Sequence, residues 1–271
     1  MLVAMASIEN NTPATRRCKP GTLPKHCPAP AMKTPAAADF PRPFTLVDVV
    51  IFTVRAGRLQ VLLVRRPLEK SDPFPGRWAL PGGFVDVTRD ADLLACARRK
   101  LLEKTAVVSP YLEQLGSWGG ARRDPRGWSA THVYFALIAA PDEPPSAAGS
   151  QAAQEAGWFA VDALPGRRAL AFDHDEILRA AIERLQSKVE YTSLPAFLLP
   201  EPFTLPQLQK IYEIVLGRAV DKSGFRTRML AMDFLDEAGY QHGPAKRPAM
   251  GYRLRDRHAP VVFPRTFGTQ R

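Results

Sequence analysis

The sequence contains few cysteines and no long apolar run, and both deficits restrict the class of protein. Its three cysteines, Cys18, Cys27 and Cys96, are odd in number and widely spaced, which excludes a disulfide framework and a paired-cysteine zinc site. No window reaches the ~18 uninterrupted apolar residues of a membrane-spanning helix. The first residues turn polar too early for a secretory signal peptide. We therefore expect a cytoplasmic chain with no membrane partner.

Acidic residues are also scarce relative to basic ones. The 27 Asp and Glu residues are outnumbered by 37 Lys and Arg, which gives a formal net charge of +10. This excess favours a polyanionic partner but does not specify a fold. The 45% hydrophobic and 24% charged content is that of a globular protein and excludes a wholly disordered or collagen-like chain.

The chain divides into segments of different character. Residues 1–43 are rich in Pro, Ala, Thr and Lys without helical or strand periodicity, so we expect a disordered basic leader. Met5 and Met32 could each begin a shorter chain. Residues 44–190 form the first predicted domain and residues 191–202 a Pro-rich linker. A second domain at 203–256 and a basic tail at 257–271 complete the five predicted segments.

The first domain has the pattern of a mixed α and β fold. Apolar, β-branched residues at 45–54 and 59–64 flank Arg55-Ala56-Gly57, which predicts a strand hairpin. Three further apolar segments are predicted to be strands, at residues 111–118, 131–138 and 155–159. Two amphipathic segments are predicted to be helices, at 91–104 with Asp90 as N-cap and at 173–189.

The second domain has the pattern helix, helix, two strands. Thr204 is expected to cap a helix over 205–216 that ends at Gly217. Asp221 is expected to cap a second helix that runs through Leu235 and ends at Gly239. Residues 240–254 then predict two short strands around a basic turn, the arrangement of a winged helix-turn-helix.

Residues 80–85 of the first domain read LPGGFV, and Arg99 and Glu103 follow on the predicted helix. This glycine-rich motif resembles the signature of the Nudix superfamily. In that signature, carboxylates on a loop and a helix hold Mg²⁺ against a diphosphate. Residues 80–85 (LPGGFV) fit its start, Arg99 fits its arginine and Glu103 fits the first glutamate of its final pair. The resemblance implies an α+β fold, with a Nudix-type α/β/α sandwich around a mixed sheet.

The same segment departs from the signature where the acids belong. Lys100 and Lys104 stand in place of two helix glutamates, Arg89 replaces the loop glutamate, and Ala106 replaces a glycine. The loop is also longer than the family spacing. Because ammonium groups oppose a divalent cation, we expect a site that binds a nucleotide diphosphate without cleaving it, with no required cofactor.

Two other interpretations of this helix remain open. Its Arg and Lys residues are alternatively only the solvated face of a core helix. Alternatively the chain is a Mg²⁺-dependent Nudix hydrolase of a nucleoside diphosphate derivative such as ADP-ribose. In that case Glu103 and Asp86, or else Asp90 or Asp92, would hold the metal.

A second basic segment resembles Nudix members that handle ADP-ribose and related dinucleotides. It reads Arg122-Arg123-Asp124-Pro125-Arg126-Gly127-Trp128, and arginine forks suit diphosphates. Trp128 alone is as readily explained as a cover for the sheet. The predicted ligand-binding residues are Trp78, Gly82, Gly83, Arg99, Lys100, Arg122, Arg123 and Arg126.

The second domain resembles the winged helix of the Nudix-related transcriptional regulators, and the resemblance covers both domains, roughly residues 44–254. Members of that family join a Nudix-like ligand domain to a DNA-binding tail and control genes of NAD synthesis or pentose use. The resemblance implies a transcriptional repressor, a homodimer on operator DNA that senses an ADP-ribose-type nucleotide. A dimerisation module and a nucleotide-binding adaptor are the alternatives. The predicted DNA-binding residues are Lys222, Ser223, Arg226 and Arg228 on the second helix, and Lys246 and Arg247 in the wing.

Overall fold

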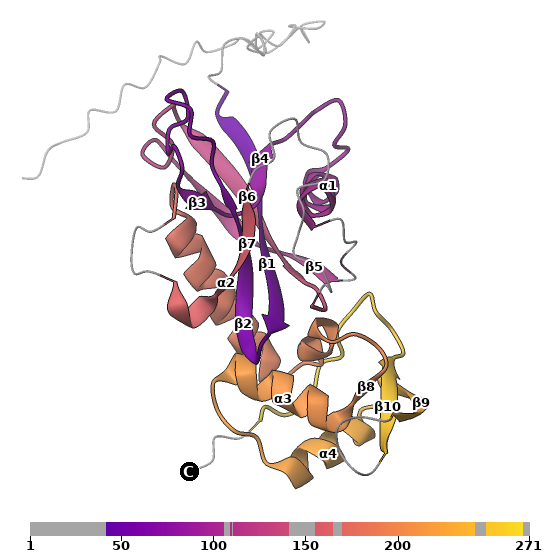
Figure 1. The fold of residues 1–271 in the computed structure, drawn as a ribbon. Coiled ribbons are helices and arrows are strands. Elements are labelled where there is room, and N and C mark those ends of the chain that lie inside the picture. Colours follow the sequence, from indigo (N-terminus) through magenta and orange to yellow (C-terminus); the bar gives the residue numbers. More distant parts are fainter. Residues whose placement is uncertain are drawn as a thin grey trace, which may run out of the picture. The chain divides into compact units, whose positions relative to one another are not determined.

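A mixed seven-stranded sheet is the centre of the first domain (Figure 1). The computed structural model describes residues 42–105, 109, 111–140, 155–164, 170–241 and 248–267, so nearly all of the predicted leader lies outside the described residues. The strands are β1 (Phe44–Arg55), β2 (Arg58–Arg65), β3 (Trp78–Ala79), β4 (Gly82–Phe84), β5 (Tyr111–Gly120), β6 (Ser129–Leu137) and β7 (Ala156–Ala160).

The strand order makes the sheet mixed. The central path is β3-β2-β1-β6-β5, with β4 paired with β1 and β7 paired with β2. Strands β1 and β6 are parallel, whereas the other pairs are antiparallel. The predicted hairpin at 45–64 is confirmed as β1 and β2, because the turn at Ala56 and Gly57 has left-handed backbone that lets the strands reverse.

Helices cover both faces of the sheet (Figure 1). Along β1, Val47, Val49 and Ile51 belong to the apolar cluster under α1 (Leu93–Thr105), whereas Val50 and Phe52 belong to the cluster under α2 (His174–Val189). Alternate side chains of a strand point to opposite faces, so a continuous apolar strand needs cover on both. The α/β/α sandwich with a mixed sheet is therefore confirmed.

The start of α1 differs from the sequence prediction. The helix begins at Leu93, and the carboxylate of Asp92 accepts a hydrogen bond from Ala95 N at 2.7 Å. Asp90, predicted as the N-cap, is instead buried against Arg99. Asp90 thus forms an ion pair with Arg99 instead of capping the helix as the local sequence predicts.

The winged helix-turn-helix consists of two helices and a three-stranded sheet. It contains β8 (Phe203–Thr204), α3 (Leu205–Leu216), α4 (Lys222–Ala231), β9 (Leu235–Gln241) and β10 (Ala249–Leu254), with strand order β8-β10-β9. Helix α3 has the predicted bounds, because Thr204 and Gln207 form a capping box and Gly217 ends the helix with φ 68°.

Helix α4 is shorter than predicted. It ends at Ala231, and Leu235 pairs with Leu254 as the first residue of β9. Asp233, with φ 50°, lies between the helix and the strand. The pairing of β9 with β10 therefore takes residues that the local pattern assigns to the helix.

Residues predicted as a linker contribute to the core. The described residues include two short 3₁₀ helices, η2 (Val161–Ala163) and η3 (Leu194–Leu198), and every residue of η3 is buried. The Tyr212 hydroxyl of α3 donates to Thr192 O at 2.7 Å. Buried side chains from α2, η3 and α3 belong to one apolar cluster.

Within the described ranges, no helix is long and apolar enough to cross a membrane.

Candidate functional site

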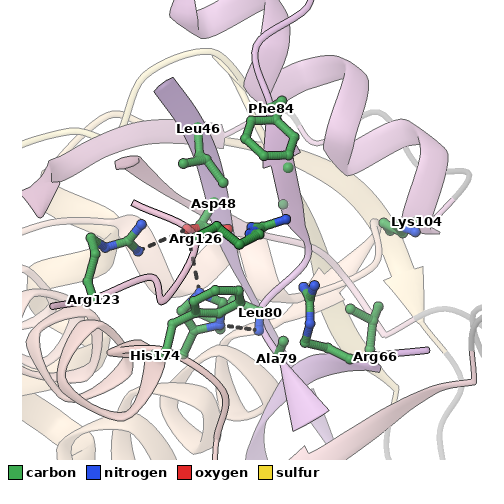
Figure 2. A pocket seen from close by; sticks show the side chains of 14 residues that line it. Leu46, Asp48, Arg66, Ala79, Leu80, Phe84, Lys104, Arg123, Arg126 and His174 are labelled. Atoms are coloured by element: carbon green, nitrogen blue, oxygen red, sulfur yellow. Dashed lines mark hydrogen bonds and ion pairs between the residues drawn. The ribbon is translucent and has the colours of Figure 1, made fainter. Parts of the chain in front are cut away.

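A cavity of about 200 Å³ opens beside the glycine-rich motif (Figure 2). Its wall combines basic, aromatic and apolar side chains with one buried acid. The lining residues are Leu46, Asp48, Val64, Arg66, Ala79, Leu80, Gly82, Gly83, Phe84, Lys104, Arg123, Arg126, Phe172 and His174. They come from β1 to β4, the end of α1, the β5–β6 connection and the start of α2.

The two glycines occupy positions that other residues would not readily take, Gly82 for lack of space and Gly83 for its backbone conformation. A Cβ atom at Gly82 would lie 1.9 Å from Asp48 Oδ1 and 2.8 Å from Val47 O. At Gly83, with φ 148°, it would lie 3.0 Å from Lys100 Nζ. Glycine is therefore needed for β4 to approach β1 closely here and to keep the backbone at the cavity wall.

Asp48 is the acid at the base of the cavity. Figure 2 shows it between Arg123 and His174. Thr131 Oγ1 donates to its carboxylate at 2.7 Å, and His174 Nε2 lies 3.6 Å from Oδ2. Leu80 N donates to His174 Nδ1 at 2.9 Å, which orients the ring so that Nε2 faces Asp48. The cavity base is thus tied to the first residue of α2.

The ionisation of Asp48 follows from these contacts. Burial alone would raise the pKa of this carboxyl, but His174, Thr131 and Arg123 outweigh burial and bring the pKa below its ordinary value. Asp48 is therefore an anion that holds Arg123 and His174 in place rather than an acid that releases a proton near neutral pH.

Three arginines of the wall are each oriented by a carboxylate. Arg66 forms two hydrogen bonds with Asp72, Arg123 two with Asp173, and Arg126 two with Asp124. A guanidinium has five donors, so each arginine retains donors beyond this pair.

Two phenylalanines lie beside these guanidinium groups. The Arg66 guanidinium is 4.9 Å from the Phe172 ring centroid, and that of Arg126 is 5.3 Å from the Phe84 centroid. The side chain of Phe84 is 46% exposed. The wall therefore offers cations for a diphosphate next to flat faces for a base or sugar.

The predicted ligand-binding residues divide into two groups. Gly82, Gly83, Arg123 and Arg126 line the cavity. The others are not among the lining residues of the described chain: Trp78 packs on Phe159, Arg99 pairs with Asp90, and Lys100 and Arg122 lie outside the wall. Their part in ligand binding stays a prediction.

The wall residues that the sequence prediction missed include Asp48, Arg66, Phe172 and His174. A sequence signal existed for Asp48, because it is the one acid in the apolar run of β1. His174 had no such signal, since it reaches Asp48 only through the packing of α2 on the sheet.

The acids that a hydrolase would use have other partners. Glu103 Oε1 lies 3.2 Å from Arg99 and 3.8 Å from Arg89, and Oε2 lies 4.0 Å from Lys100 Nζ. Asp86 accepts hydrogen bonds from Thr88, while Asp90 pairs with Arg99 and Asp92 caps α1. In the described part of the chain, no three Asp, Glu, His or Cys side chains form a metal-binding group.

Lys104 adds a cation at the cavity wall. Burial and the neighbouring Lys100 lower the pKa of Lys104 below its ordinary value. Two adjacent lysines thus occupy the side of α1 from which the motif glutamates of the signature would approach a metal. This local field favours a phosphate over a cation.

The predicted DNA-binding residues also differ in their surroundings. Lys222, Ser223 and Arg226 are exposed on the first turns of α4, while Phe225 and Met229 are buried. Arg228 is half-buried and donates to Thr266 O at 2.9 Å, so it faces the C-terminal segment. Lys246 and Arg247 lie outside the described residues.

These features define a Nudix domain joined to a winged helix. Residues 45–181 match the NUDIX domain family, and residues 195–254 match the NrtR DNA-binding winged helix domain. The chain belongs to the NrtR family.

Alignments with related proteins cover most of the chain. It is 45% identical over 228 residues to the ADPR responsive transcriptional repressor NtrR of Acinetobacter baylyi, an alignment that spans 84% of this chain and 88% of that one. Shewanella oneidensis NrtR superposes with a TM-score of 0.71 at 41% identity, covering 82% of this chain and 99% of that chain. The structure of the same protein complexed with a 27mer DNA superposes with a TM-score of 0.70 at 37% identity, covering 83% of this chain and 99% of that chain.

Proposed function

We propose that this protein is an ADP-ribose-responsive transcriptional repressor. Its Nudix domain binds the nucleotide and its winged helix binds operator DNA. One observation carries the proposal: a cavity with three arginines, a lysine and a glycine cradle shares a chain with a helix that exposes basic residues. The similarity to the ADPR responsive repressor of Acinetobacter baylyi supports the same function.

The cavity suits a dinucleotide that keeps its diphosphate intact. Arg66, Arg123 and Arg126 replace Mg²⁺ as the source of positive charge, and Phe84 offers an exposed ring for stacking. We propose that no cofactor is required. A ligand that is not consumed can hold a binding equilibrium, which a sensor needs.

The winged helix suits duplex DNA. The N-terminal part of the second helix of a helix-turn-helix enters the major groove, and here that part exposes Lys222, Ser223 and Arg226. The Shewanella oneidensis relative has been crystallised with DNA. We propose a cytoplasmic homodimer, because helix-turn-helix proteins commonly read paired half-sites.

The double variant Lys222→Ala/Arg226→Ala is expected to bind DNA roughly 10- to 100-fold more weakly, since it loses a base contact and a phosphate contact. Fluorescence anisotropy would be measured on a duplex from the gene's own upstream region. Added ADP-ribose is expected to change the wild-type affinity by roughly 5- to 150-fold, a typical coupling between two sites.

Arg179→Ala, an exposed arginine on α2, is the matched control for loss of charge and should bind as the wild type does. If the wild type shifts no upstream fragment at low salt, the repressor function is refuted and a nucleotide-binding adaptor is favoured. If ADP-ribose leaves the DNA affinity unchanged, the response to ADP-ribose is refuted but DNA binding is not.

The hydrolase alternative predicts metal-dependent cleavage of ADP-ribose, whereas the repressor proposal predicts none at an enzymatic rate. We expect no release of AMP from ADP-ribose at an ordinary enzymatic rate with Mg²⁺ or Mn²⁺, because Glu103 is surrounded by Arg89, Arg99 and Lys100. Chromatography of the reaction products would measure the release of AMP. Metal-dependent turnover that Glu103→Gln abolishes would contradict the proposal.

A further inference from the structure

A segment beyond the family match packs against the winged helix. We call residues 259–267 the C-terminal strap; the match to the NrtR winged helix ends at residue 254. On one side the strap pairs with the backbone that follows α2. Val261 O accepts from Ser193 N at 2.9 Å, Phe263 N donates to Tyr191 O at 2.7 Å, and Phe267 N donates to Glu190 O at 3.0 Å. These bonds attach the strap to the C-terminal end of α2.

On its other side the strap contributes aromatic rings to the core of the winged helix. Phe267 is 7% exposed, and its ring centroid lies 5.1 Å from that of Tyr212 on α3 and 6.0 Å from that of Phe225 on α4. Phe263 is 3% exposed and contacts Phe234. The side chain of Phe267 therefore packs against both helices of the helix-turn-helix.

The strap also binds the polar side of α4. The Arg228 guanidinium donates to Thr266 O at 2.9 Å and lies 4.2 Å from the Phe267 ring centroid, within the range of a cation–π contact. In the turn before α4, Arg218 donates to Phe267 O at 3.1 Å and to Glu190 at 2.8 Å. Helix α4 and the turn that precedes it are thus attached to the strap.

Helix α4 buries few of its own side chains. It has ten residues, of which only Phe225 and Met229 are buried. Helices of this length are marginal in water without tertiary packing. From these contacts we infer that the C-terminal strap is a positioning element for DNA recognition, in which Phe267 and Thr266 orient α4. The inference rests on the proposed role of α4 as the DNA-contacting helix.

Phe267→Ala in the full chain tests this role. Its affinity for the upstream duplex is expected to fall by roughly 10- to 100-fold, as for loss of a base contact. The slope of log affinity against log salt should decrease by about one, because a misplaced helix loses a phosphate contact. Hydrogen–deuterium exchange of the DNA-free protein should rise in residues 222–231 and stay unchanged in residues 79–84 of the cavity.

Two further variants separate positioning from general destabilisation. Phe267→Leu keeps an apolar side chain in the same space and should restore part of the affinity. Val262→Ala is the matched control, since Val262 is in the strap but 65% exposed, and it should behave as the wild type does.

The inference is overturned if Phe267→Ala binds DNA as tightly as the wild type does. It is also overturned if exchange in residues 222–231 is unchanged, or rises equally across the chain. If the wild type binds no DNA, the proposed function fails, whereas the exchange experiment still decides whether the strap holds α4.

Discussion

Gly82→Ala is expected to destabilise the protein by about 3 kcal/mol, an overpacking effect at the upper end of its usual range, and to abolish ADP-ribose binding. The added Cβ would lie 1.9 Å from Asp48 Oδ1 and 2.8 Å from Val47 O. Because Val47 O is backbone and Asp48 is buried beside His174 and Thr131, neither atom can move away cheaply. Strand β4 must then separate from β1.

Chemical denaturation and titration calorimetry with ADP-ribose would measure both effects. Gly120→Ala is the matched control, since a Cβ at Gly120 meets no atom within 4 Å and the residue also lies in a strand. We expect the control to retain wild-type stability and binding. A Gly82→Ala protein with wild-type affinity would show that the glycine motif does not form the ligand cavity.

Asp90→Asn is expected to destabilise the protein by about 3 kcal/mol, the usual cost of removing one partner of a buried ion pair. Asp90 receives hydrogen bonds from Arg99 at 2.7 and 2.5 Å, and the two side chains are only 1% and 16% exposed. The amide cannot compensate the guanidinium charge, so Arg99 loses its buried carboxylate and keeps only that of Glu103, which is 40% exposed. Helix α1 should loosen at its start.

The same pair predicts how stability depends on pH. Hydrogen bonds from Arg99 hold the pKa of Asp90 well below its ordinary value of 3.8. A depressed carboxyl pKa stabilises the folded state above the ordinary value, and this contribution is lost as the pH falls through the folded pKa. The stability difference between wild type and Asp90→Asn should therefore be constant near neutral pH and shrink as the pH falls below 3.8.

Denaturant unfolding between neutral and acidic pH would measure this difference. Asp162→Asn is the control, because Asp162 also pairs with an arginine, Arg58, but the two side chains are 69% and 47% exposed. Exposed pairs contribute little, so we expect a much smaller effect. Equal effects of the two substitutions would contradict a structural role for the Asp90–Arg99 pair.

Local signals were sufficient for several elements. The bounds of α3 follow from Thr204, Gln207 and Gly217, which lie next to the helix ends they determine. The cover of β1 by a helix on each face follows from its continuous apolar sequence, since alternate side chains point to opposite faces. The glycines of the motif and the loss of its acids could likewise be recognised from the sequence, because each depends on residues close together in the chain.

Contacts between distant residues decided the rest. Asp48 and Arg66 reach one cavity through the pairing of β1 with β2, and His174 joins them because α2 packs on the same sheet. Helix α4 ends early because Leu235 pairs with Leu254. The Arg228 guanidinium faces the C-terminal strap because it contacts the Phe267 ring. Hydrogen bonding and burial of this kind are gained only after chain folding brings the partners together, so no pattern within either segment predicts them.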